Sequence, residues 1–165
     1  MVKRKSLGNN FTRSRAVSNI IQISVNEELT TEQVVMDGNY TDVDPNITSQ
    51  LFPWRRRNGK RTIELVDMTK HGYPVDYAFN DALNVLDELG LDRPVYEDGL
   101  LTGKQHRKKQ GKRSIMFPHE PVLIVGVRLP GVVSLLSDAG RRVLDLDWAD
   151  LEWYSDTLVA GVRRL

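Results

Sequence analysis

The sequence predicts an α+β fold in which residues 18–165 form one domain, with a mixed β-sheet and two main helices at about 74–89 and 147–164. Three patterns support this prediction. Apolar residues alternate over Ile20–Val25, as in a strand; an Asn-Gly pair separates two strand-like segments; and both proposed helices carry apolar residues at helical spacing. Residues 1–17 are basic and polar, and we expect them to form an arm outside the domain.

Local signals define the elements that follow the first strand. Thr30 or Thr31 can cap a short helix that runs through Met36 and stops at Gly38. Residues 38–50 have the composition of a loop.

The Asn58-Gly59 pair is the clearest turn signal, because both residues accept the positive φ that a two-residue type I′ turn requires. It predicts a hairpin of Leu51–Arg57 and Lys60–Val66, in which Trp54 lies opposite Ile63. The apolar residues of this hairpin would face the core, and its basic residues would form a projecting tip.

A related segment predicts a second basic hairpin. Residues 55–63 and 107–115 share three basic residues, an amide residue, Gly-Lys-Arg, a hydroxyl residue and Ile. We therefore expect basic hairpin tips at 55–61 and 107–113, and a loop over residues 91–104 between them.

The remaining elements follow from caps and periodicity. Pro74 suits the first turn of the first main helix, and Gly90 suits its C-terminal cap. Pro121–Leu129 is expected to be a buried strand, 132–139 a short helix and 142–146 another strand. The apolar stripe of the last helix is Trp148, Leu151, Leu158, Val162 and Leu165.

Composition excludes several kinds of chemistry. The chain has 165 residues and no cysteine, which excludes disulfides, thiolate zinc sites and thiol catalysis. The longest apolar stretch, Pro121–Val127, is too short to span a bilayer, so we expect no membrane contact. The first residues lack the apolar segment of a signal peptide, and we expect a cytoplasmic protein or one within a virion or nucleoprotein particle.

Charge is segregated along the chain although the net charge is only +1. Residues 1–15, 55–61 and 104–113 contain 16 of the 23 lysines and arginines and no acidic residue. Residues 16–54 contain six acids and no lysine or arginine, and residues 62–103 contain nine acids and two basic residues. Such segregation creates local fields that a near-neutral total conceals.

The three basic segments predict largely sequence-independent binding of nucleic acid, DNA or RNA, by a non-enzymatic protein. Cationic side chains on an arm and on hairpin tips can lie along phosphates. We expect the protein to act with other copies of itself, or with other subunits, in a nucleoprotein or virus-like assembly. The predicted nucleic-acid-binding residues are Lys3, Arg4, Lys5, Arg13, Arg15, Arg55, Arg56, Arg57, Lys60, Arg61, Lys104, Arg107, Lys108, Lys109, Lys112 and Arg113.

Two other functions remain open. In the first, the protein is a structural subunit whose basic segments contact the acidic segments 16–54 or 62–103 of a neighbouring copy. In the second, acidic residues between 76 and 98 bind a metal ion in a small nuclease. Trp153 and Tyr154 are the candidate subunit interface, while Trp54 and Trp148 are expected in the core.

We expect no cofactor and no resident metal ion. Gly126–Gly131 suggests a dinucleotide-binding turn, but Arg128 stands where that motif needs a glycine, and no second half-fold follows. The three histidines lack metal-ligand spacing with one another.

Overall fold

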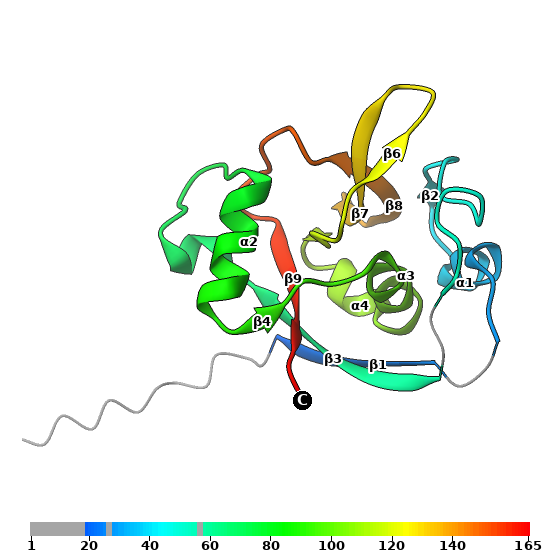
Figure 1. The fold of residues 1–165 in the computed structure, drawn as a ribbon, viewed down its shortest axis with the longest axis horizontal. Helices are drawn as coiled ribbons and strands as arrows, with labels where there is room; N and C mark the ends of the chain where they lie inside the picture. The colour runs from blue at the N-terminus through cyan, green and yellow to red at the C-terminus, as the bar shows by residue number, and fades with distance from the viewer. Residues whose placement is uncertain (1–18, 26–27, 56–57) are drawn as a thin grey trace, which may run out of the picture.

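The computed structural model describes residues 19–25, 28–55 and 58–165 (Figure 1). The described chain has an α+β fold with a mixed sheet, which confirms the predicted fold class. The strands are β1 Ile20–Val25, β2 Asp42–Val43, β3 Gly59–Val66, β4 Leu91–Asp92, β5 Ile115–Met116, β6 Val122–Ile124, β7 Leu129–Asp138, β8 Arg141–Trp148 and β9 Leu158–Arg163. The helices are α1 Thr31–Gly38, α2 Phe79–Glu88, α3 Tyr96–Gln105, α4 Arg107–Gln110 and the 3₁₀ helix η1 Met68–His71.

The sheet has the strand order β1-β3-β9-β5-β7-β8-β2, with β4 added beside β9 and β6 beside β7. The β5–β9 and β2–β8 pairs are parallel, and the other pairs are antiparallel. Strands β3 and β9, which are far apart in the sequence, therefore lie side by side in the sheet (Figure 1).

Strand alternation creates a core on each side of this sheet. In β9, Leu158 and Ala160 belong to one buried cluster and Val159 to the other. The first cluster contains side chains of α1 and α3, and the second contains those of α2. Helices α2 and α3 accordingly lie on opposite sides of β9 (Figure 1).

The elements with strong local signals form as predicted. Strand β1 has the predicted bounds, and α1 begins after Thr30, whose side chain accepts a hydrogen bond from the Gln33 N–H at 3.2 Å. Helix α1 ends at Gly38, and Asn39 follows with the left-handed backbone typical of a helix C-terminus. Strand β8 extends the predicted strand at 142–146 by one residue before it and two after it.

The first predicted hairpin is wrong. Strand β3 forms, but its neighbours are β1 and β9, so that Ile63 lies between Ile21 and Val162 instead of opposite Trp54. Residues 51–55 are not a strand. The Tyr96 hydroxyl donates to the Pro53 carbonyl, which holds this segment against α3 instead.

The predicted loop at 91–104 is also wrong, because most of it is the buried helix α3. A Cβ atom at Gly99 would lie 2.9 Å from Cγ1 of Val133, and one at Gly103 would collide with the Tyr40 hydroxyl. These glycines, which resemble turn residues in the sequence, let α3 approach β7 and the segment after α1 closely.

The second predicted hairpin is wrong as well. Residues 107–110 form the one-turn helix α4. Gln110, expected at a turn, is buried, and its Nε2 donates to the carbonyls of Leu136 at 2.9 Å and Val143 at 3.0 Å. This side chain fixes α4 to strands β7 and β8.

Three predictions near the C-terminus need correction. The last helix, expected at 147–164, is replaced by the end of β8, a loop and β9, and the short helix expected at 132–139 lies in β7 except for its last residue. The strand expected at Pro121–Leu129 is limited to β6 and a turn, so the glycine pattern lies in an antiparallel hairpin.

The first main helix begins at Phe79, five residues later than predicted.

Candidate nucleic-acid interface

The second basic segment forms an exposed cationic surface around α4. We call Arg107, Lys108, Lys109 and Lys112 the α4 patch. The side chains of Arg107, Lys108 and Lys112 are exposed, and that of Lys109 is partly exposed. No carboxylate in the described part of the chain forms an ion pair with the three lysines. The patch thus keeps its positive charge.

The neighbouring end of α3 positions this patch by bonding to the sheet edge. The Gln105 side chain accepts from the Ser24 N–H at 3.1 Å and donates to the Ser24 carbonyl at 2.7 Å. His106 Nε2 lies 2.6 Å from the Gln22 carbonyl oxygen, a distance that requires a proton on Nε2. The edge strand β1 is therefore capped by side chains, and α4 begins from a fixed point.

Lys104 and Arg107 link α3 and α4 to α1. Lys104 Nζ lies 3.3 Å from Asp37 Oδ2, and Arg107 Nη2 donates to the Asp37 carbonyl at 2.6 Å. Both cations lie at the C-terminal end of α1, where the helix dipole favours positive charge. Lys104, expected to contact nucleic acid, is thus engaged within the chain.

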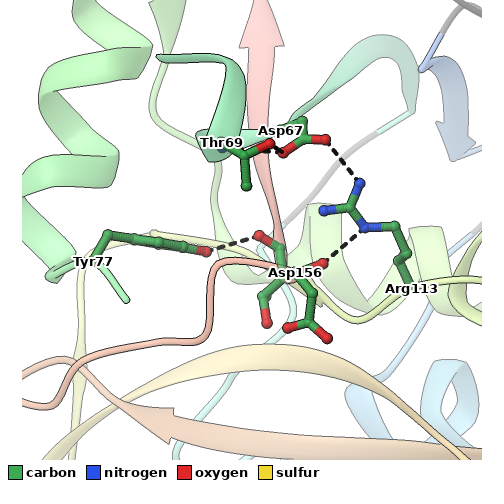
Figure 2. Close-up of polar contacts among 6 residues, drawn as sticks. Asp67, Thr69, Tyr77, Arg113 and Asp156 are labelled. Atoms are coloured by element: carbon green, nitrogen blue, oxygen red, sulfur yellow. Dashed lines mark hydrogen bonds and ion pairs between the residues drawn. The ribbon is translucent and has the colours of Figure 1, made fainter. Parts of the chain in front are cut away.

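Arg113 lies in a structural cluster and not in the α4 patch. Its Nη1 is 3.0 Å from Asp67 Oδ2, and its Nε donates to the Asp156 carbonyl at 2.8 Å (Figure 2). Burial would raise the pKa of Asp67, but hydrogen bonds from Arg113 and Thr69 lower it to about 2. Arg113 therefore connects the end of β3 to the loop before β9.

The first basic segment lines two adjoining hollows. The β3–β9 groove, of about 370 Å³, is lined by Lys60, Arg61, Thr62, Asp92, Val162, Arg163, Arg164 and Leu165. The α3 pocket, of about 550 Å³, is lined by Leu51, Arg55, Arg61, Val95, Tyr96, Glu97, His119, Glu120, Pro121 and Val122. Arg61 borders both hollows, and its Nη2 lies 2.9 Å from the buried carboxylate of Asp98.

Most of the cations in the β3–β9 groove have acidic partners. Arg163 Nε lies 2.8 Å from Glu64, and Arg164 Nε lies 2.7 Å from Asp92. Only Lys60, of the four basic residues in the groove, forms no ion pair with a described carboxylate. Sequence reasoning missed this groove because it depends on the long-range pairing of β3 with β9.

The segregated charges therefore meet within one chain. Arg61, Lys104 and Arg113 come from the basic segments, and their partners Asp98, Asp37 and Asp67 come from the acidic ones. These ion pairs account for part of the charge pattern without any external partner. Predicted residues 3, 4, 5, 13, 15, 56 and 57 lie outside the described residues.

An acidic hollow of about 440 Å³ lies beside β7 and β8. Its carboxylates are those of Asp138, Asp147, Glu152 and Asp156. Burial, together with the nearby Asp145 carboxylate, raises the pKa of Asp147. This hollow carries the opposite charge to the α4 patch.

The candidate interface pair separates into one buried and one exposed residue. Trp153 is only 6% exposed and packs against Tyr77 and Phe79, so it belongs to the core of this chain, and its role in a subunit interface stays a prediction. Tyr154 is 75% exposed and borders the acidic hollow. Trp54 and Trp148 are partly buried against the first core cluster.

The histidines have separate roles in the described chain. His71 is exposed, and His106 contacts β1, whereas His119 is buried and bonded to backbone groups. No group of three or more His, Cys, Asp or Glu side chains in residues 19–25, 28–55 and 58–165 is arranged to hold a metal ion. None of the helices in these residues is both long and apolar enough to cross a membrane.

Comparison with known proteins gives no relative: no family model, no curated protein and no solved structure matches the chain.

Proposed function

We propose that the protein binds nucleic acid, largely independently of sequence and without catalysis, through the α4 patch. The observation that supports this proposal is the set of three lysines, Lys108, Lys109 and Lys112, which no described carboxylate neutralises. An ammonium group is a compact point charge that attracts phosphate but does not read a base edge. Binding by such groups is electrostatic and tolerant of sequence.

The α4 patch has the rigidity that a phosphate contact favours. Gln110 and Gln105 attach both ends of this region to strands, so little order must be gained on binding. The basic arm, residues 1–17, and Lys60 in the β3–β9 groove supply further cations for the same polyanion. A nucleoprotein or virus-like assembly is the setting in which we propose this binding takes place.

Salt dependence of binding tests the proposal. Each phosphate neutralised on duplex DNA contributes about −0.9 to the slope of log K against log salt concentration. The Lys108→Ser/Lys112→Ser double variant should therefore flatten the slope by about two units. Lys70→Ser/Arg128→Ser is the matched control, because it removes the same charge from exposed positions on η1 and the β6–β7 turn.

Two results would contradict the proposal. The first is that the wild-type protein binds neither labelled duplex nor labelled single strand at low salt. The second is that both double variants change the salt slope equally. Incubation of plasmid and RNA with magnesium tests the absence of catalysis, since cleavage would favour the nuclease.

A structural subunit is the second candidate function, and the acidic hollow beside β7 and β8 favours it. The α4 patch of one copy has the charge to contact this hollow in another copy. Sedimentation of nucleic-acid-free protein separates the two candidates, because only this second function predicts large assemblies at low salt that dissociate at high salt.

A further inference from the structure

The α3 pocket is a second, chemically different site. It lies between residues 51–55, the first turn of α3 and the segment 119–122 that leads into β6. Its volume of about 550 Å³ falls within the range of small-molecule sites, roughly 300–1,000 Å³. The α4 patch does not border it, although Arg55 and Arg61, both predicted to bind nucleic acid, are among its lining residues.

The Tyr96 ring forms a rigid aromatic wall of this pocket. Phe52 packs edge-on against the ring, with 5.3 Å between centroids, and His119 does so at 5.8 Å. The Tyr96 hydroxyl donates to the Pro53 carbonyl, which fixes the ring in its plane. Val95 and Val122 add apolar surface, so the pocket suits a flat, largely apolar ring.

Two guanidinium groups line the same pocket. Arg55 is exposed. Arg61 is held by its ion pair with Asp98, and its Nε has no hydrogen-bond partner within the described chain. Arg61 also borders the β3–β9 groove, so the groove and the pocket share one guanidinium group.

Glu97 adds a carboxylate to the lining of this pocket. Its side chain lines the pocket although the residue is only 4% exposed, and its Oε1 accepts from the Arg55 N–H at 3.3 Å. Asp98 Oδ2 accepts from the Val95 N–H at the start of α3, which disfavours a simple anion there.

A ligand for this pocket must therefore combine a flat ring with an anionic group. We propose that the α3 pocket binds one unstacked nucleotide of the nucleic-acid strand, with its base against Tyr96 and its phosphate at Arg55 and Arg61. This assignment rests on the proposed function.

Isolated nucleoside monophosphates test this proposal on the full chain. Calorimetric titration of GMP, AMP, CMP and UMP should give saturable binding of all four, because each combines a flat ring with a phosphate. Inorganic phosphate alone should bind more weakly than GMP. Arg55→Ala, at an exposed position, should weaken all four nucleotides.

Controls separate this site from the α4 patch and from misfolding. The Lys108→Ser/Lys112→Ser variant should keep GMP binding while its duplex binding weakens. Far-UV circular dichroism checks that the Arg55→Ala variant is folded. The pocket assignment is overturned if no nucleotide binds wild type at millimolar concentration, if phosphate equals GMP, or if Arg55→Ala leaves binding unchanged. Failure of duplex binding alone, with GMP binding intact, would instead contradict the proposed function.

Discussion

The imidazole Nε2 of His119 accepts a hydrogen bond from the Val133 N–H at 2.8 Å. The other ring nitrogen, Nδ1, lies 2.7 Å from the Glu120 carbonyl oxygen and must carry the proton. The ring is thus neutral, and it fills a gap in strand pairing between β5 and β6, where β7 would otherwise leave a buried donor unpaired.

This arrangement predicts acid sensitivity. Burial lowers the pKa of His119 from 6.5 to about 4, so at intermediate pH the unfolded chain binds a proton that the folded chain does not. The free energy of unfolding should fall as the pH drops from about 6.5 to about 4, by roughly 3 kcal/mol in total. Urea denaturation at several pH values measures this decrease in the free energy of unfolding.

Two variants check the origin of this pH dependence. His119→Gln should be destabilised at neutral pH and should lose most of the dependence between pH 6.5 and 4. His71→Gln, at an exposed position, should behave like wild type. Equal pH profiles for wild type and His119→Gln would assign the effect to other groups.

The glycines of α3 predict a second contrast in stability. Gly103→Ala should lower the free energy of unfolding by about 1–3 kcal/mol, because the added methyl group meets the partly buried Tyr40 ring. Gly126→Ala has open space around it and should change stability by less than about 0.5 kcal/mol. Thermal unfolding of both variants measures this difference, and similar losses would mean that α3 does not pack as described.

Short-range signals in the sequence predicted only part of this fold. Strand β1 and helix α1 depend on alternation and on the Thr30 cap, which act within a few residues. The pairing of Ile63 with Ile21 and Val162 joins segments that are far apart, and it prevails over the turn preference of Asn58-Gly59. Such competition cannot be judged from one segment alone.

The wrong prediction of a helix at residues 147–164 has a geometric cause. Leu158 and Val162 are four residues apart, a spacing that places side chains on one face of a helix. Because four is an even number, the same spacing also places them on one face of a strand, and both belong to the first core cluster. The pattern was therefore compatible with both structures.

The candidate site was predicted in part as well. Exposure of Lys108 and Lys112 follows from charge, since isolated lysines are seldom buried. The ion pairs of Arg61 and Arg113 depend on which acidic side chains the fold brings near, as do the walls of the α3 pocket. Those features require the tertiary structure.

The two neighbouring aromatic residues at 153 and 154 should respond differently to truncation. Trp153→Ala should cost about 3–5 kcal/mol, because it removes a ring packed against Tyr77 and Phe79. Tyr154→Ala should leave the melting temperature nearly unchanged, since its side chain is 75% exposed. Sedimentation of the Tyr154→Ala variant also reports whether this ring contributes to self-association beside the acidic hollow.

Lys112 and Arg113 are adjacent basic residues with separable roles. Arg113→Ala should destabilise the protein by about 1–2 kcal/mol, because Asp67 and the Asp156 carbonyl lose a charged donor that is only partly screened by solvent. Lys112→Ala removes an exposed side chain and should change stability by less than about 0.5 kcal/mol. On duplex DNA, Lys112→Ala should flatten the salt slope by about one unit, while folded Arg113→Ala should retain the wild-type slope. Chemical denaturation and binding at several salt concentrations measure both properties, and loss of slope in Arg113→Ala alone would reverse the two assignments.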